Sequence, residues 1–164
     1  MSRSKHFDLK NLSYNAGSLH LELDMSRFER QFQEAQYYLD GAVMNSMVPY
    51  MPMITGSFIN TTRAASASVQ GSGLVYAAYA PQGGFLYEGK VMVDEMTGSP
   101  WARRGARKVL VSEYTGKTNA KENISYTHQA HPKAQDHWFN AAKEADGKTW
   151  IKDVKRIAGG GKHG

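Results

Sequence analysis

The chain has 164 residues, of which 41% are hydrophobic and 21% charged, a balance typical of one globular domain that excludes a disordered chain. No apolar run approaches the roughly 18 residues of a spanning helix, so no membrane association is expected. The absence of cysteine excludes disulfides and thiolate zinc sites and fits a reducing cytoplasm, while a net charge of +5 permits contact with an anionic surface.

The N-terminal part of the chain is predicted to be an arm. Residues 1–18 are polar and end in the turn-forming letters NAGS, which predicts a flexible segment. In residues 19–23 leucines alternate with polar side chains, and this period of two predicts a half-buried strand. A single α+β domain is expected to extend from residue 19 to residue 157.

A long helix is predicted to follow from Ser26, because Glu29 three residues later completes a capping box. Its apolar residues recur at spacings of three or four. They are Phe28, Phe32, Ala35, Leu39, Val43 and Met47. Gly41 predicts a kink or a close crossing, since glycine costs roughly 1 kcal/mol in a helix interior. Pro49 disfavours helical geometry at Val48, where the helix is predicted to end.

The middle of the chain is predicted to form a small antiparallel sheet of about four to five strands. Small, β-branched and alternating segments stand on both sides of the GSG at residues 71–73, which predicts a Gly-rich turn. A single helical turn or loop is predicted at 81–90, followed by a long hairpin at 90–114. The predicted strands are 57–70, 74–80, 90–94, 108–114 and 124–129.

A second helix is predicted at the end of the domain. Pro132 suits the first turn of a helix, which then extends to about residue 157. Gly147 is predicted to interrupt it, and residues 158–164 to form a flexible tail. The order of elements predicts an α+β fold in which the long N-terminal helix and the C-terminal helix pack on the sheet.

Patterns that carry chemistry are weak in this sequence. It has no GxSxG elbow, and TGKT at 115–118 lacks the P-loop glycine because position 111 is Val111. Late side chains that could bind a divalent metal are His128, His131, Asp136 and His137. Because Asp136 and His137 are adjacent, a polar loop with His131 capping the helix is favoured over a metal-dependent enzyme. We therefore expect no enzyme and no cofactor.

The strongest charge feature is the basic run Arg103, Arg104, Arg107 and Lys108, with Trp101 beside it. Arginine and an aromatic ring on a loop could grip phosphate and stack on a base. The same residues could anchor a contact with an acidic neighbouring subunit, where Trp and Arg are frequent. A solvated hairpin tip is the third interpretation.

Three segments stand in order along the chain: a proline-rich corner leading to Thr-Gly, a tyrosine-rich segment running into a Tyr-Glu-x-Gly turn, and a Pro, Ala, Trp-Phe, Ala-Lys series. Their residues are Pro52, Thr55, Gly56, Phe58, Tyr76, Tyr79, Ala80, Tyr87, Glu88, Gly89, Pro132, Ala134, Trp138, Phe139, Ala142 and Lys143. In this pattern, residues 25–146 resemble the minor capsid, or tail-completion and neck, proteins of long-tailed phages. Pro81 departs from that pattern by following the Tyr-Ala pair.

The resemblance implies a structural virion protein at the head–tail junction, made in the cytoplasm of the host bacterium. It implies a homo-oligomeric ring, or a ring-bound adaptor, around the DNA channel. The implied partners are other neck, connector and tail proteins, with non-specific contact to packaged DNA. The implied fold is a small antiparallel sheet crossed by a long helix. The alternative from another class is a small basic nucleic-acid-binding domain.

The corner PYMPMI ends the long helix with two prolines and several apolar side chains. Prolines reduce the chain entropy that association removes, and methionines are adaptable apolar fillers. We expect Tyr50, Met51, Met53 and Ile54 either to contact another part of an assembly or to close the core beneath the strands. Burial of these side chains within the subunit distinguishes the two alternatives.

Overall fold

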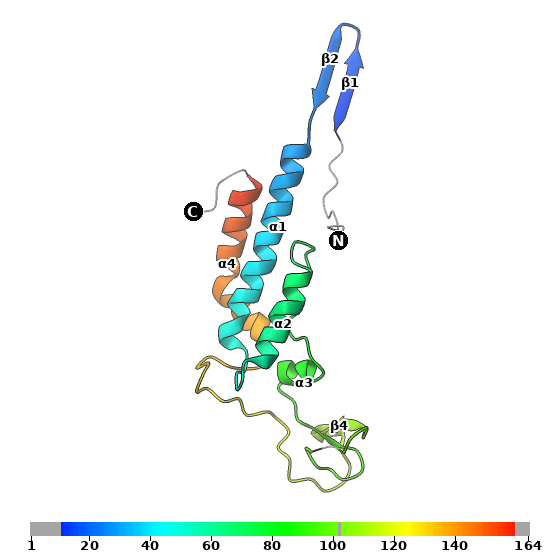
Figure 1. Ribbon diagram of the computed structural model, residues 1–164, viewed down its shortest axis with the longest axis vertical. Helices are drawn as coiled ribbons and strands as arrows, with labels where there is room; N and C mark the ends of the chain where they lie inside the picture. Colours follow the sequence, from blue (N-terminus) through cyan, green and yellow to red (C-terminus); the bar gives the residue numbers. More distant parts are fainter. Residues whose placement is uncertain (1–10, 102, 160–164) are drawn as a thin grey trace.

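The computed structural model describes residues 11–101 and 103–159 of the chain. They form an elongated α+β structure with three parts in a row along its longest axis (Figure 1). A hairpin at one end, residues 11–25, is called the arm below. A helical body follows, and the opposite end holds loops and a second small sheet. Residues 1–10 of the predicted arm and residues 160–164 of the predicted tail lie outside the described residues.

The arm consists of two antiparallel strands, β1 (Leu12–Ala16) and β2 (Leu19–Leu23), joined by a two-residue turn. Gly17 adopts φ 59° in this turn, a conformation that glycine reaches without steric cost. The predicted strand at 19–23 is confirmed, and residues 12–16 form its partner. The predicted half-burial is wrong, because every residue of both strands is exposed.

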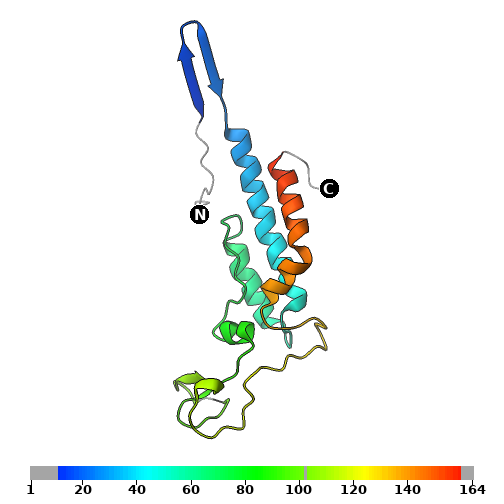
Figure 2. The same cartoon turned by 180° about the vertical axis from the view of Figure 1, so that it is seen from behind.

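Two long antiparallel helices make the centre of the body, α1 (Ser26–Met47) and α4 (Trp138–Ala158), as Figure 2 shows from behind. Helix α1 begins at Ser26, as predicted, and ends at Met47, one residue before the predicted end at Val48. A short 3-10 helix, η1 (Val48–Tyr50), follows it directly. The capping box is absent from its first turn, which has no side-chain cap hydrogen bond. The predicted apolar stripe is buried only in part, since Phe28 and Phe32 are exposed.

The core lies at the lower half of the body, where α1, η1, α4 and helix α2 (Ser57–Ser68) meet. Its buried members are Met44, Met47, Met51, Ile59, Trp138, Ala142 and Trp150. Three of these seven are methionines, whose unbranched side chains fill irregular gaps between crossing helices.

Helix α2 replaces the first strand predicted for the middle of the chain. Its buried residues are Ile59, Thr62 and Ser66, at spacings of three and four that define one helical face. Two of the three are polar, so the helical period was hidden from a reading of apolar residues alone.

The segment 74–80, predicted as the next strand, is held by side chains of α2 and pairs with no strand of the described chain. The backbone N–H of Tyr76 donates to Ser66 Oγ at 3.1 Å, and that of Tyr79 donates to Thr62 Oγ1 at 3.1 Å. Buried backbone groups need such partners, and here two hydroxyls supply what a sheet ladder would supply.

The turn before this segment is fixed by a buried carboxylate. Asp40 on α1 accepts the backbone N–H groups of Gly71 at 2.7 Å and Gly73 at 3.1 Å through Oδ2. The close approach predicted at Gly41 is also present: a Cβ added there would lie 2.6 Å from Gln70 Nε2. These contacts tie the end of α2 to the middle of α1.

The remaining strands are short. Helix α3 (Gly83–Glu88) is the predicted helical turn, followed by β3 (Met92–Asp94), β4 (Lys108–Leu110) and the 3-10 helix η2 (Val111–Glu113). Strands β3 and β4 pair antiparallel, so the predicted hairpin is present. The predicted strand at 124–129 is absent, and the residue before it, Asn123, forms one isolated bridge with Lys90.

A sheet of four to five strands is therefore a wrong prediction, as is the sheet that the resemblance implied. The described residues contain two separate two-stranded sheets, which lie at opposite ends of the molecule, so neither forms a layer against the long helices. The general α+β class, the long N-terminal helix and the C-terminal helix are confirmed.

Helix α4 begins later than predicted and runs through Gly147 without a break. Residues between Pro132 and His137 are held to other segments, since Gln135 N–H donates to Tyr50 O and His137 N–H donates to Tyr87 O. Because these N–H groups bond to other segments, the helix does not begin at Pro132 as predicted. Among the described residues, no helix combines the length and apolar character needed to cross a membrane.

Trp138 allows a test of where the core lies. Its side chain is fully buried and donates from Nε1 to Ala77 O at 2.8 Å, so Trp138→Phe removes both volume and a hydrogen bond. We expect the free energy of unfolding, measured by urea denaturation, to fall by about 2 kcal/mol. The matched control Trp101→Phe, at an exposed position, should change it by less than about 0.5 kcal/mol. Equal effects of the two substitutions would contradict this core.

Candidate assembly surfaces

The connection between β3 and β4 is organised by one buried carboxylate. Asp94 is fully buried and accepts hydrogen bonds from Met96 N at 2.8 Å, Thr97 N at 3.1 Å and Arg103 Nε at 3.1 Å. The Arg103 guanidinium, followed by the Met96 N–H, holds the pKa of Asp94 well below its ordinary value. Asp94 is therefore ionised at neutral pH and fixes the path of the loop on both sides.

This fixed loop presents large apolar side chains to solvent. Trp101 is 87% exposed and Met96 is 77% exposed. The Trp101 N–H donates to Ser99 Oγ at 3.1 Å, which orders the backbone that carries the indole. An exposed tryptophan on an ordered backbone can enter a partner's pocket with little further loss of entropy.

The basic run is used largely within the loop. Arg103 pairs with Asp94, Arg107 Nη1 lies 3.6 Å from Glu95 Oε1, and Lys108 Nζ donates to Pro100 O at 3.3 Å. Arg104 is exposed. Three of the four cations of this run therefore already have acceptors within the loop.

The proline-rich corner is mainly an internal contact. Met51 is fully buried in the core, and Tyr50 and Met53 are half-buried against it. Tyr50 O accepts the N–H of Gln135, so the corner also holds the segment before α4. Of the four candidate interface residues only Ile54, which is 87% exposed, is available to a partner.

The late histidines serve the chain's own packing. His131 Nδ1 lies 2.8 Å from Met51 O, and the His137 ring contacts Glu88 Oε2 at 3.3 Å and Asp136 Oδ1 at 3.5 Å. His137, not His131, precedes the first turn of α4, with φ 44°. In the parts of the chain that the structure describes, no group of three His, Asp or Glu side chains is arranged to hold a metal.

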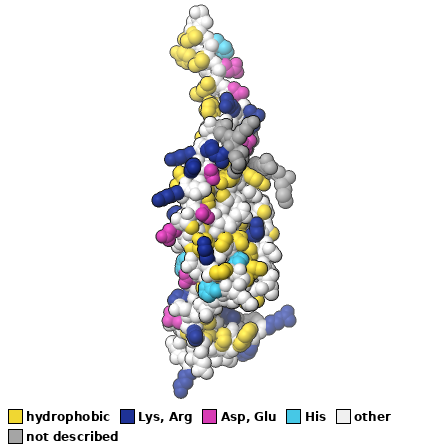
Figure 3. All heavy atoms as spheres, turned by 90° about the vertical axis from the view of Figure 1, so that its left-hand side faces the viewer, with side chains coloured by type: hydrophobic (Ala, Val, Ile, Leu, Met, Phe, Trp, Pro, Cys, Tyr) yellow, Lys and Arg dark blue, Asp and Glu magenta, His cyan; other side chains and the backbone are white. Residues whose placement is uncertain are grey.

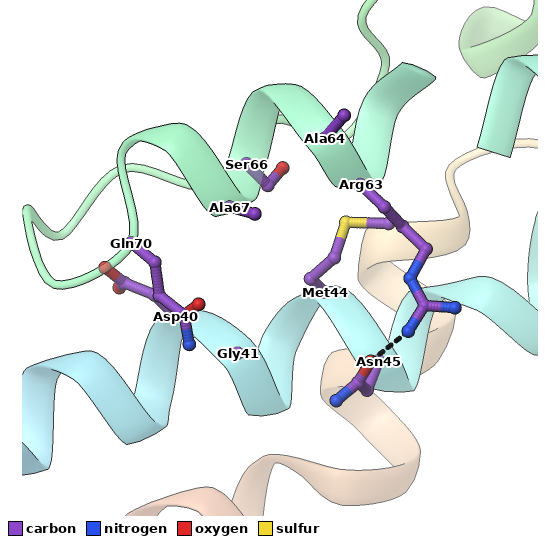
Figure 4. Close-up of a pocket in the computed structure, with 9 residues that line it drawn as sticks. All are labelled: Asp40, Gly41, Met44, Asn45, Arg63, Ala64, Ser66, Ala67 and Gln70. Atoms are coloured by element: carbon purple, nitrogen blue, oxygen red, sulfur yellow. Dashed lines mark hydrogen bonds between the residues drawn. The ribbon is translucent and has the colours of Figure 1, made fainter. Parts of the chain in front are cut away.

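A shallow groove of about 390 Å³ lies between α1 and α2 (Figure 4). Asp40 and Gln70 lie toward one end, and at the other Arg63 donates to Asn45 Oδ1 at 3.0 Å. The carboxylate of Asp40 already accepts backbone N–H groups, as described above, and Arg63 is held by Asn45. The groove therefore pairs these polar groups internally.

The arm carries the largest feature that sequence reasoning missed. Cross-strand partners include Leu12 with Leu23 and Tyr14 with Leu21, and paired residues share one face of a two-stranded sheet. That apolar face consists of Leu12, Tyr14, Ala16, Leu19, Leu21 and Leu23, whose large side chains are 44–63% exposed. Figure 3 shows the hydrophobic side chains on one side of the arm and its histidine and acidic side chains on the other.

The signal for this face was present in the sequence. Alternation at residues 12–16 mirrors that at 19–23 around the Gly17 turn, and together they read as one hairpin. A two-stranded hairpin is marginally stable alone in water, and this one also has two open edges. Its uncovered apolar face is the surface that most needs a partner.

Comparison of the chain with family models, with curated proteins and with solved structures found no match in any of the three.

The role of Asp94 can be tested by proteolysis of the loop. Asp94→Asn removes the charge that holds Arg103, so trypsin cleavage at the loop arginines should accelerate about tenfold. Glu95→Gln is the matched control, because its exposed pair with Arg107 is longer, and should change the rate less than about twofold. Cleavage rates followed by mass spectrometry report both, and equal rates would show that Asp94 does not order the loop.

Proposed function

We propose that this chain is a structural subunit of the head–tail joint of a tailed phage and acts through protein–protein contacts. The observation that carries this proposal is the uncovered apolar face of the arm. The arm projects beyond the helical body, so the chain's own core leaves this face unburied (Figure 1). A subunit that completes its fold only against a neighbour has this property.

The magnitude of that exposure supports an assembly role. Full burial of a leucine side chain contributes about 1.5–3 kcal/mol, and the arm's five large apolar residues are each about half exposed. Covering them would supply roughly 5 kcal/mol before the cost of association is subtracted. That is a large contribution for a structure as small as one hairpin.

The identity of the assembly rests on the resemblance of residues 25–146 to minor capsid, tail-completion and neck proteins. It supports a ring or ring-bound adaptor around the DNA channel, in the virion, with other neck, connector and tail proteins as partners. Within this proposal the protein makes and breaks no covalent bond. The Asp94-ordered loop with Trp101 supplies a second contact surface, at the end of the molecule opposite the arm.

The alternative, a nucleic-acid-binding domain, has less support from the geometry. A phosphate-binding patch needs cations that are available to the ligand, whereas Arg103, Arg107 and Lys108 each have an acceptor within the loop. Non-specific contact with packaged DNA by the remaining basic surface is compatible with the structural role.

The arm's role in assembly is tested by Leu21→Ser in the phage that encodes the chain. We expect the yield of infectious particles to fall at least about tenfold, with heads and tails left unjoined in negative-stain images, because the apolar face is weakened. His20→Ser, on the opposite face of the same strand, is the control and should keep the normal yield. Normal yield with Leu21→Ser would contradict the proposed function.

The nucleic-acid alternative is tested by titrating the purified chain with a short DNA duplex at increasing salt. We expect weak binding whose affinity falls only slowly with salt concentration. Few basic side chains of the loop are free to neutralise phosphates, so few counterions are released from the DNA. Trp101 fluorescence gives a local readout, since Trp138 and Trp150 are buried. Tight binding with a steep salt slope that Arg104→Ala and Arg107→Ala reduce would favour the alternative.

A further inference from the structure

The outer edge of β2 is complementary to itself. We infer that the arms of two copies pair edge to edge, β2 against β2 in antiparallel orientation about a two-fold axis at Leu21, and form one four-stranded sheet. This inference rests on the proposed function, since it names a second copy as the neighbour of the arm. It is carried by the hydrogen-bonding pattern of the arm, the order of its side chains and its place in the molecule.

The backbone of β2 has an open edge. Ala16 and Leu19 flank the two-residue turn and pair with each other, so their N–H and C=O groups face inward. Because the direction of these groups alternates along a strand, those of His20 and Glu22 face outward. No other described residue hydrogen-bonds to these outward backbone groups. A strand edge of this kind can accept a further strand.

Ladder geometry limits how two such edges can pair. In an antiparallel ladder, residues whose backbone groups face outward stand opposite one another, so His20 can face His20, Glu22 or Asp24 of a second copy. With His20 opposite Asp24, Glu22 stands opposite Glu22, which is repulsive. With His20 opposite His20, Leu23 stands opposite Gly17 and the leucines are out of step. The remaining register places His20 opposite Glu22 on both sides of the two-fold axis.

The polar face of β2 is matched in this register. An imidazole and a carboxylate directly opposite each other attract, and the two-fold axis gives two such pairs. Within one copy His20 Nδ1 contacts Asn15 Oδ1, whereas His20 Nε2 lies 4.0 Å from Glu22 Oε2, beyond hydrogen-bond distance. Both side chains are exposed, so Nε2 and the carboxylate are available to a second copy.

The apolar face is matched in the same register. Leu21 stands opposite Leu21, and Leu19 stands opposite Leu23. These pairs exchange no hydrogen bonds, so their Cα atoms lie about 4.5 Å apart and their side chains touch. A lone hairpin is marginally stable in water, whereas a sheet of three or more strands with an apolar face is stable. Pairing therefore supplies what one arm lacks.

The place of the arm leaves room for a second arm. It projects beyond the helical body, with its turn at the far end (Figures 1 and 2). In this register Gly17 of the turn stands opposite Met25 of the second copy, the residue before α1. Each arm therefore ends where the other helix begins, and the two bodies lie at opposite ends of the shared sheet. This isologous contact joins copies in pairs, in addition to the heterologous contacts that close a ring.

The size of the edge predicts a weak contact between free copies. Two five-residue strands cover far less than the roughly 800 Å² per partner of a standard interface. Assembly would raise the occupancy of the contact through effective concentration. A covalent trap is therefore the appropriate measurement in solution.

The absence of cysteine permits a specific trap. Leu21→Cys is oxidised mildly at high concentration, and the disulfide-linked dimer is quantified by mass spectrometry. Tyr14→Cys is the matched control, because it lies beside Leu21 on the same face with 59% against 56% exposure. In the four-stranded sheet its two copies are about 14 Å apart, too far for a disulfide.

We expect the Leu21→Cys dimer to exceed the Tyr14→Cys dimer about tenfold, since opposed Cα atoms at about 4.5 Å suit a disulfide. Arms packed face to face, or random collisions, would trap both positions alike. An equal or lower yield from Leu21→Cys would overturn the inference.

The register has a test of its own. Leu19→Cys and Leu23→Cys are prepared separately, one of them labelled with heavy nitrogen, and mixed before oxidation. We expect the mixed dimer to exceed both homodimers about tenfold, because like positions are roughly 13 Å apart along the antiparallel strands. Dominant homodimers would indicate parallel strands in register and would also overturn the inference.

A charge exchange between copies adds an independent readout. Glu22→Lys and His20→Glu are introduced separately into the Leu21→Cys chain, and the two proteins are mixed and oxidised. Each homodimer opposes like charges, whereas the mixed dimer opposes a carboxylate to a basic group at both pairs. We expect the mixed dimer to exceed each homodimer about sixfold, where random pairing gives about twofold. Random proportions would overturn the register.

The outcomes separate the two proposals. A normal particle yield with Leu21→Ser defeats the proposed function itself. Equal trapping of Leu21→Cys and Tyr14→Cys, together with a defective Leu21→Ser phage, defeats only the pairing of arms inferred here.

Discussion

Trp138 is the contact on which the arrangement of the other elements depends. Its fully buried ring, at the first residue of α4, packs edge-on against Phe58 of α2 and Tyr87 of α3, and its Nε1 donates to Ala77 O. One side chain thereby joins two helices and the extended segment to the long helix pair. The direction of that pair then determines where the arm and the loop project.

The two projecting ends are built on opposite physical principles. The loop is ordered from inside, by an ionised Asp94 that satisfies backbone and guanidinium donors in a buried position. The arm has an ordered backbone ladder but leaves its apolar face in solvent. The loop backbone is thus held by contacts within the chain, whereas the apolar face of the arm is not covered by the described residues.

The proline-rich corner makes most of its contacts within the chain. Met51 enters the core, and Tyr50 O holds the segment that precedes α4. The prolines therefore reduce the entropy lost when two distant segments meet, and of the four candidate residues Ile54 is left for an external contact.

Local patterns alone determined the long helix from Ser26 and the strand at 19–23, and they indicated a helical turn or loop near residue 85. Each depends on neighbours within a few residues, through periodicity, glycine or proline. The order of these elements predicted the α+β class and the hairpin of β3 with β4. Tertiary structure decided the rest. Residues 57–68 are helical, and their buried Thr62 and Ser66 hydroxyls accept the backbone N–H groups of Tyr79 and Tyr76, so that segment required no sheet. Because two of the three buried residues of this helix are polar, a pattern of apolar residues does not show its period, and only the folded chain reveals the hydrogen bonds that they accept.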